Sequence, residues 1–209
     1  MAESLAWPRP HAWTVIAAVE PVAVNSDSAL AGVDDRALVE ACLAGRPGAF
    51  DLIVERHRRA VYRLCYRFVN NHEDASDLSQ DVFLRAYRGL KTFRGHSSLA
   101  TWLYRISVNV CLNRVSVRTP TLEQIDEHSI TDAAESASER VLRVERGTFV
   151  RAAIAQLPRK QRATLILRIY HEMSHQEIAD VLDSSVGAVK ANLFHALGNL
   201  KKLIGEEMP

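Results

Sequence analysis

The sequence predicts an all-α protein in which two helical domains are joined by a flexible acidic linker. Apolar residues recur at three- and four-residue spacing through most of 34–118 and 139–204, as on the buried face of an amphipathic helix. Residues 119–138 interrupt this period with proline, serine, threonine and acidic side chains. Since no segment needs a strand to explain its pattern, we predict a tail over 1–33, domains over 34–118 and 139–209, and the linker between them.

The net charge of +1 hides a strong segregation of charge along the chain. Residues 34–118 hold 14 lysines and arginines against 9 acids, and 140–209 hold 11 against 7. Residues 119–139 hold six acids and no lysine or arginine. Two basic segments suit a nucleic-acid partner, and an acidic tether between them would avoid the same phosphates.

Cysteine content and hydropathy favour a cytoplasmic protein. Cys42, Cys65 and Cys111 are odd in number, far apart and without a C-x-x-C pair, which indicates reduced thiols. No apolar run reaches the roughly 18 residues that a membrane-spanning helix needs. The start of the chain lacks the basic segment of a secretory signal, and we predict no membrane insertion.

The first domain begins after a tail that contains Pro8, Pro10 and Pro21 and no helical period. Asp34 is suited to cap a short helix that Gly45 ends. The expected inward face of this helix consists of Leu38, Cys42 and Leu43.

Three longer helices complete the predicted first domain. The second opens near Pro47 and ends at Asn70-Asn71, the third runs from Glu73 to about Leu90, and the fourth begins after Ser97 or Ser98 and ends near Val117. The second helix carries an apolar stripe at Phe50, Ile53, Val54, His57, Val61, Leu64, Cys65 and Phe68. The third and fourth turn inward Ala75, Leu78, Val82, Ala86 and Leu90, then Leu99, Trp102, Leu103, Ile106 and Val110. We interpret His57 as a histidine at the edge of the core rather than a ligand.

The segment 174–195 is typical of a helix-turn-helix that reads DNA. Ser174 and Glu177 form a capping box, and Asp183 suits the left-handed turn that follows. Ser185 can then cap a second helix whose predicted inward face is Val189, Leu193 and Leu197. Lys190, Asn192 and His195 are left on other faces, where they are free to meet a DNA groove or phosphates. An ordinary helical hairpin is the alternative.

Four segments in order resemble the alternative sigma factors of bacterial RNA polymerase, of the extracytoplasmic-function (ECF) type within the sigma-70 family. They are D-A-S-D-L-S-Q-D-V-F-L-R-A-Y at 74–87, F-R-G-H-S-S-L-A-T-W-L-Y-R-I-S-V-N at 93–109, L-P-R-K-Q-R at 157–162, and the helix-turn-helix. The resemblance implies a region 2 helical bundle over 34–118 and a region 4 helix-turn-helix over 139–209. It also implies a sigma factor that binds core RNA polymerase, reads the −10 and −35 promoter elements and assists melting.

The helix at 73–90 resembles region 2.2, which binds the clamp helices of the polymerase β′ subunit. The residues that this resemblance assigns to core-polymerase binding are Asp74, Asp77, Gln80, Asp81 and Arg85. Their spacing allows one polar surface. A solvated face with an Asp81–Arg85 ion pair is the alternative, and Leu78 and Phe83 are expected to pack inside.

The loop at 93–98 resembles the segment that captures a flipped base of the −10 element. An unstacked base needs apolar or aromatic walls and hydrogen bonds to its edge. The residues assigned to −10 DNA are Phe93, Arg94, Gly95, His96, Ser97, Ser98, Arg105, Asn109 and Arg114. Trp102 lies on the apolar stripe, so we expect it to pack in the core.

The recognition helix departs from the pattern G-T-V-K-S-R-L-x-R-A that many members share, because this chain reads G-A-V-K-A-N-L-F-H-A at 187–196. Asn192 and His195 replace arginines, and asparagine favours adenine where arginine favours guanine. The −35 preference is therefore expected to be unusual. The residues assigned to −35 DNA are Ser185, Val186, Gly187, Ala188, Lys190, Ala191, Asn192 and His195.

The resemblance further implies three partners: core RNA polymerase through β′ and the β flap, promoter DNA, and an anti-sigma factor of the kind common in the family. The linker would occupy the path of nascent RNA, and L-P-R-K-Q-R lies near the face that meets the flap. The sequence contains no cluster of a nucleophile with its base, no cysteines and histidines at metal-ligand spacing, and no glycine-rich phosphate loop. We therefore predict that the protein is not an enzyme and that it has no metal site and no cofactor. The alternative function is a stand-alone helix-turn-helix transcriptional regulator, which usually binds as a dimer.

Overall fold

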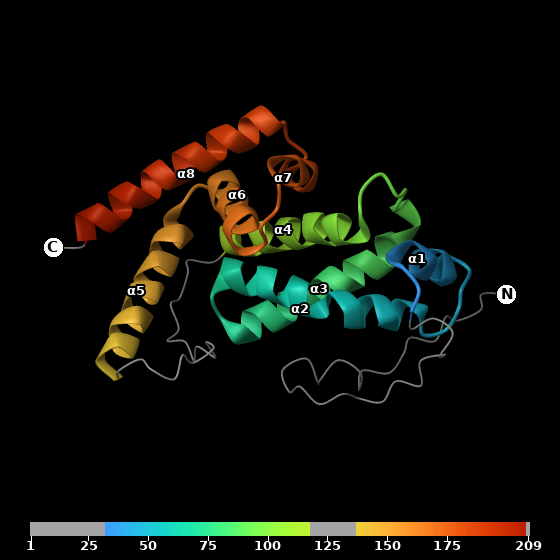
Figure 1. Ribbon diagram of the computed structural model, residues 1–209. Coiled ribbons are helices and arrows are strands. Elements are labelled where there is room, and N and C mark those ends of the chain that lie inside the picture. The colour runs from blue at the N-terminus through green and yellow to red at the C-terminus, as the bar shows by residue number, and fades with distance from the viewer. Residues whose placement is uncertain (1–31, 118–136, 208–209) are drawn as a thin grey trace.

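The structure is a computed structural model that describes residues 32–117 and 137–207. Within these ranges the chain forms eight α-helices and one short 3-10 helix, and no strand. Figure 1 shows α1 to α4 gathered in one bundle, with α5 to α8 beside and above it. The predicted all-α class is confirmed. Most of the predicted tail and linker lies outside the described residues.

The first bundle contains α1 (Asp35–Leu43), α2 (Ala49–Val69), α3 (His72–Gly89), the 3-10 helix η2 (Leu90–Thr92) and α4 (Leu99–Val117). Its helix ends follow the predicted local signals. The Asp34 carboxylate accepts a 2.8 Å hydrogen bond from the backbone N–H of Ala37. Asn70 ends α2 with a left-handed φ of 54°, and Asn71 caps α3.

The core of this bundle lies where α2, α3 and α4 pack together. The predicted inward residues of α3 are all buried, as are most of those on the predicted stripes of α2 and α4. Leu78 and Phe83 pack inside as expected, and Trp102 is half-buried against the core. His57 lies at the core edge with its Nε2 3.0 Å from an Asp35 carboxylate oxygen.

The prediction that Leu43 faces inward is wrong. Its side chain is 50% exposed, whereas Leu38, Val39 and Ala41 are buried. Leu43 is the last residue of α1, and the chain turns away at Gly45 with a φ of 74°. The final turn of α1 therefore projects beyond the helices that would have covered it.

The second group contains α5 (Ala137–Gln156), α6 (Arg159–Tyr170), α7 (His175–Leu182) and α8 (Val186–Glu207). The predicted capping box is present: the Ser174 hydroxyl accepts from the N–H of Glu177, whose carboxylate accepts from the N–H of Ser174. Asp183 ends α7 with a left-handed φ of 47°, so the turn has the predicted form.

The prediction that Leu197 continues the inward face of α8 is also wrong. Leu197 is 51% exposed, while Val189 and Ala196 are fully buried. An α-helix has 3.6 residues per turn, so a residue eight positions after Val189 is rotated away from the buried face. Ala196 stays on that face, and Leu200 is packed against the core.

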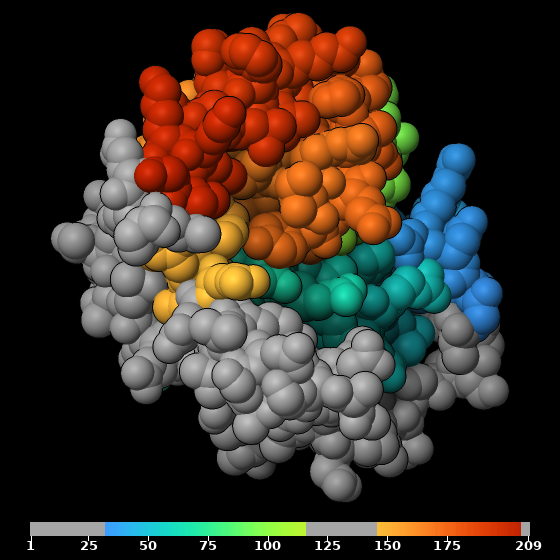
Figure 2. Space-filling model, turned by 60° about the vertical axis from the view of Figure 1, so that its left-hand side comes forward, coloured from blue at the N-terminus to red at the C-terminus, as the bar shows by residue number. Residues whose placement is uncertain are grey.

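The two groups are in direct contact. Helix α7 packs against α4, and α6 packs against α2. The space-filling view shows the same arrangement, with orange helices of the second group resting on teal helices of the first (Figure 2). Arg105 of α4, one of the residues predicted to contact DNA, takes part in this contact by donating to the backbone carbonyl of Asp180 on α7.

Candidate nucleic-acid interface

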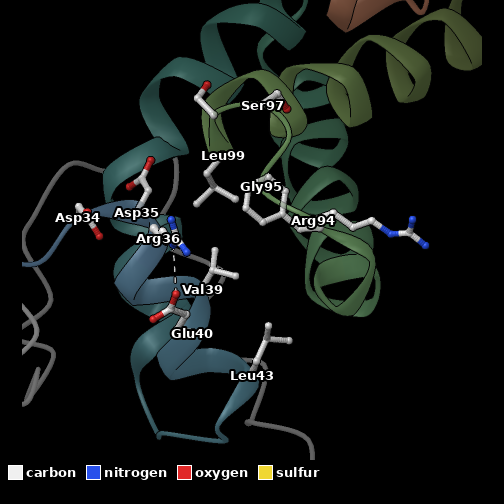
Figure 3. Close-up of a pocket in the computed structure, with 12 residues that line it drawn as sticks. Asp34, Asp35, Arg36, Val39, Glu40, Leu43, Arg94, Gly95, Ser97 and Leu99 are labelled. Carbon is white, nitrogen blue, oxygen red and sulfur yellow. Dashed lines mark hydrogen bonds and ion pairs between the residues drawn. The ribbon is translucent and has the colours of Figure 1, made fainter.

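A hollow of about 490 Å³ lies between α1 and the loop at 93–98. Its volume is in the range of pockets that hold a small molecule. Figure 3 shows Val39 and Leu43 on α1, with Leu99 at the start of α4 lying next to Gly95 of the loop. Gly95 has a φ of 70°, a left-handed conformation that favours glycine and bends the loop around the hollow.

The charged side chains at the rim of the hollow differ in how strongly they are held by partners within the protein. The Asp34 carboxylate caps α1, and Asp35 is paired with Arg56 at 2.7 Å and with His57. Arg36 and Glu40 form an exposed ion pair at 3.2 Å. Such a pair contributes little stability, so both side chains can reorient toward a ligand.

The loop at 93–98 presents polar side chains and one aromatic ring. Arg94 and His96 are exposed, and Figure 3 shows Arg94 extending away from α1. The Phe93 ring is half-buried with its centroid 5.5 Å from that of Trp102. The Ser98 hydroxyl accepts from the N–H of Thr101 at 3.1 Å and so anchors the start of α4.

Helix α4 does not bring its three predicted DNA contacts to one face. Arg105 and Arg114 are nine residues apart, which is two and a half turns, so they point to opposite sides. Arg114 bonds the Asp74 carboxylate on α3 at 2.6 Å, whereas Arg105 donates to the backbone carbonyl of Asp180 on α7. The Asn109 side chain is exposed and makes no hydrogen bond to another residue that the structure describes.

Helix α3 carries the residues predicted to bind core polymerase, and they form one polar strip. Asp77 and Arg85 are exposed, and Gln80, Asp81 and Asp74 are partly so. Arg85 pairs with Asp81 at 3.0 Å, and this hydrogen bond raises the pKa of the arginine. The ion pair named in the alternative interpretation of this helix is therefore present. Because it is exposed, it remains open to exchange for a partner's charges.

The residues predicted to contact −35 DNA lie at the start of helix α8 and in its N-terminal half. Gly187, Lys190, Ala191 and His195 are exposed. Val186, Ala188 and Asn192 are half-buried. The exposed Ser185 caps the helix by accepting from the N–H of Ala188 at 3.2 Å.

One exposed residue on α8 was missed by the sequence reasoning. Phe194 is 75% exposed, with its ring centroid 5.7 Å from that of His195. It occupies the variable position of the family pattern. An aromatic residue off the apolar face of a predicted recognition helix was the signal that could have identified it.

Comparison with known proteins accounts for both helical groups. Residues 53–120 match Sigma-70 region 2, and residues 150–200 match Sigma-70, region 4. The chain is 35% identical over 181 residues to the RNA polymerase sigma-H factor of Pseudomonas aeruginosa, covering 81% of this chain and 93% of that protein. The chain belongs to the ECF sigma factors of the sigma-70 family.

Other similar proteins agree. The sigma factor is 34% identical over 173 residues to the ECF RNA polymerase sigma factor SigM of Mycobacterium tuberculosis, covering 82% of this chain and 85% of that one. Its fold is similar to that of CnrH in the structure of CnrH with the cytosolic domain of CnrY. The TM-score is 0.60 and the identity 25%, over 83% of this chain and 99% of that chain.

This sigma factor directs RNA polymerase to promoters, and its partners are the polymerase and promoter DNA. No helix among the described residues is long and apolar enough to cross a membrane. Nor do those residues gather three or more histidine, cysteine or acidic side chains that could hold a metal ion.

Proposed function

We propose that α3 is the surface of this sigma factor that binds core polymerase, through the clamp helices of β′. The strip of Asp74, Asp77, Gln80, Asp81 and Arg85 supports the assignment because it is polar and continuous and carries exposed or partly exposed ion pairs. The β flap would contact the second domain near the start of α6. The polymerase would carry out the chemistry of RNA synthesis.

The hollow beside the loop at 93–98 is assigned to an unstacked base of the −10 element. The supporting observation is its shape: apolar walls from α1, a left-handed glycine in the loop, and exposed polar groups at the rim. These are the features that a flipped base requires. We give the name −10 face to the loop together with Arg105, Asn109 and Arg114, of which Arg114 lies on the opposite side of α4 from Arg105.

The −35 element is assigned to the N-terminal half of α8, where Ser185 to His195 form the −35 face. Lys190 would bind a phosphate, and Asn192 would read adenine. Phe194 adds an exposed apolar contact suited to a thymine methyl group. The open helix surface supports this assignment.

An anti-sigma factor is the proposed regulator, and the cytoplasm is the proposed location. The similarity to CnrH, whose structure was solved with the cytosolic domain of CnrY, supports the first. Three free cysteines, two of them buried, support the second. The domains over 34–118 and 139–209, with the tail and the linker, remain our proposed division of the chain.

Run-off transcription tests the proposed function. Purified bacterial core polymerase is mixed with a pool of promoter fragments, with and without this protein. We expect transcripts from defined start sites only when the protein is present, and the upstream sequences of those transcripts would give both promoter elements. Absence of stimulation, together with salt-sensitive duplex binding by the protein alone, would favour the stand-alone regulator.

A further inference from the structure

Helix α2 carries a concentration of positive charge toward its C-terminal end. From Arg56 to its last residue, Val69, the helix contains five arginines and no acidic residue. Four of these arginines are exposed and follow one another at steps of three, four and four residues, which keeps them on one side of the helix. We call them the arginine stripe: Arg56, Arg59, Arg63 and Arg67.

The two ends of the arginine stripe are held by partners within the protein, and its centre is not. Arg56 forms a 2.7 Å ion pair with a carboxylate of α1. The Arg67 guanidinium lies 4.1 Å from the centroid of the Tyr170 ring, a cation–π contact. The side chains of Arg59 and Arg63 form no hydrogen bond or ion pair with any other residue that the structure describes. The stripe is therefore fixed at both ends, with its unpaired charges in the middle.

The centre of the stripe is electrostatically unfavourable in the isolated protein. Arg59 and Arg63 are four residues apart on α2, a spacing at which like charges destabilise a helix. The positive charge extends to the neighbouring domain: burial lowers the pKa of His171, and the charges of Arg63 and Arg67 lower it further. A bound anion would relieve this repulsion, so a polyanion is the class of ligand that fits the stripe.

The arginine stripe starts at the hollow that is assigned to an unstacked base. Arg56, its first residue, pairs with Asp35, and Asp35 lines that hollow (Figure 3). From Arg56 to Arg67 the stripe extends about 16 Å, because a helix rises about 1.5 Å per residue. This length spans about five phosphates of a strand in duplex geometry, since each phosphate rises about 3.4 Å. A DNA strand with one base in the hollow can therefore lie along α2.

We propose that the arginine stripe binds the phosphates of the promoter strand whose unstacked base enters the hollow, and that it does so without reading sequence. The proposal rests on the proposed function of the −10 face. Arginine suits this role, because its guanidinium is always charged and can bind a phosphate through two parallel hydrogen bonds. Phosphate contacts fix the position of a strand, while base contacts specify its sequence. The stripe would thus hold the strand in place while the hollow receives the base.

A double variant tests the centre of the stripe. Arg59→Gln with Arg63→Gln removes both unpaired charges, and glutamine has nearly the same helix propensity as arginine, so α2 should keep its structure. The matched control is Arg46→Gln with Arg88→Gln. Both control arginines are exposed, form no ion pair with a described residue, and are assigned neither to DNA nor to polymerase. Circular dichroism verifies that both full-length variants remain folded.

The readout is the salt dependence of promoter binding by holoenzyme. Core polymerase is saturated with wild-type or variant protein, and its affinity for a fluorescent promoter recovered by run-off transcription is measured over a range of salt concentrations. Each phosphate contact contributes about 0.7–0.9 to the slope of log affinity against log salt. We expect the double variant to lower this slope by about 1.4–1.8, equally on promoters altered at −10 or at −35, and the control to match wild type.

The outcomes separate the arginine stripe from the proposed function. An unchanged slope in the double variant, an equal loss in the control, or a loss that depends on promoter sequence would overturn the phosphate contacts and leave the proposed function intact. Weaker binding of labelled core polymerase, with an unchanged promoter slope, would assign the stripe to an acidic surface of the polymerase instead. If wild-type holoenzyme binds no promoter in the pool, the proposed function is wrong, and the phosphate contacts of the stripe are overturned with it.

Discussion

The −10 face and the −35 face differ in how much of each is already engaged within the molecule. On the first, Arg105 is bonded to α7 and Arg114 to Asp74, and Phe93 packs on Trp102. On the second, Lys190, Ala191 and Phe194 are exposed. Three members of the −10 face are thus engaged in contacts within the protein, although Arg94, His96 and Asn109 are exposed, whereas the −35 face is open.

This difference has a consequence for the order of binding. A residue that must leave an internal partner binds DNA with an affinity reduced by the fraction of molecules in which it is free. An exposed residue has no such penalty. Free sigma factor is therefore expected to contact −35 DNA more readily than the −10 strand, until a partner separates the domains.

The largest expected effect comes from reversing a charge on the polar strip of α3 that is proposed to bind core polymerase. Asp81→Arg places a cation beside Arg85, and we expect loss of core binding by at least about 2 kcal/mol, the size of an interface hot spot. Folding should change little, because the lost exposed ion pair contributes about 0.3–0.5 kcal/mol. Binding to labelled core polymerase and thermal melting measure the two effects.

The control for this variant is Glu55→Arg, the same change at an exposed position on α2. It should bind core polymerase as wild type does. Loss of helicity or solubility in Asp81→Arg would show that its face is buried, and normal core binding would show that polymerase does not use it.

A smaller effect is expected on the open face. Asn192→Ala removes the proposed adenine contact, and we expect a change of about 1–3 kcal/mol in discrimination between −35 sequences, with core binding unchanged. Transcription from a panel of −35 variants measures this change. Equal activity of the variant and wild type on every promoter in the panel would refute the assignment of Asn192.

In the closed form of the protein, α6 and α7 pack against α2 and α4, and the His171 ring meets that of Tyr104 edge-on with centroids 5.1 Å apart. This packing is expected to weaken in acid through His171. Burial, followed by the charges of Arg63 and Arg67, lowers the pKa of His171 from 6.5 to about 4. Above pH 6.5 the histidine is neutral in both open and closed forms. Below it, the exposed histidine of the open form takes up a proton first, so the closed form loses stability as the pH falls from 6.5 toward 4.

Between pH 6.5 and 4, the ratio of closed to open molecules should fall by up to about tenfold for each unit by which the pH is lowered. Scattering between pH 7 and 5 measures the change in dimensions, and His171→Phe should remove most of it, since phenylalanine keeps a ring beside Tyr104 without a titratable group. An identical pH response in the variant would mean that His171 does not control the contact.

The fold was largely predictable because its signals are local. The capping box of Ser174 and Glu177, the stop at Asn70 and the apolar period of α2 each act within a few residues, and each is found where predicted. Leu197 was predicted wrongly because a four-residue repeat approximates a period of 3.6 only over short stretches.

The state of the candidate site could not be predicted in the same way. Arg162 lies in the polar sequence L-P-R-K-Q-R, which gives no local indication that its side chain is buried against another domain. Arg105 and Arg114 both suit DNA by residue type. Their separation onto opposite sides of α4, and their partners on α7 and α3, depend on tertiary packing.

The most direct test of the closed and open faces is a titration of the free wild-type protein, at one salt concentration, with a −35 duplex and separately with a −10 strand. We predict that the −35 duplex binds more tightly than the −10 strand, because the −35 residues need not leave an internal partner. Tighter binding of the −10 strand by the wild-type protein would contradict the account.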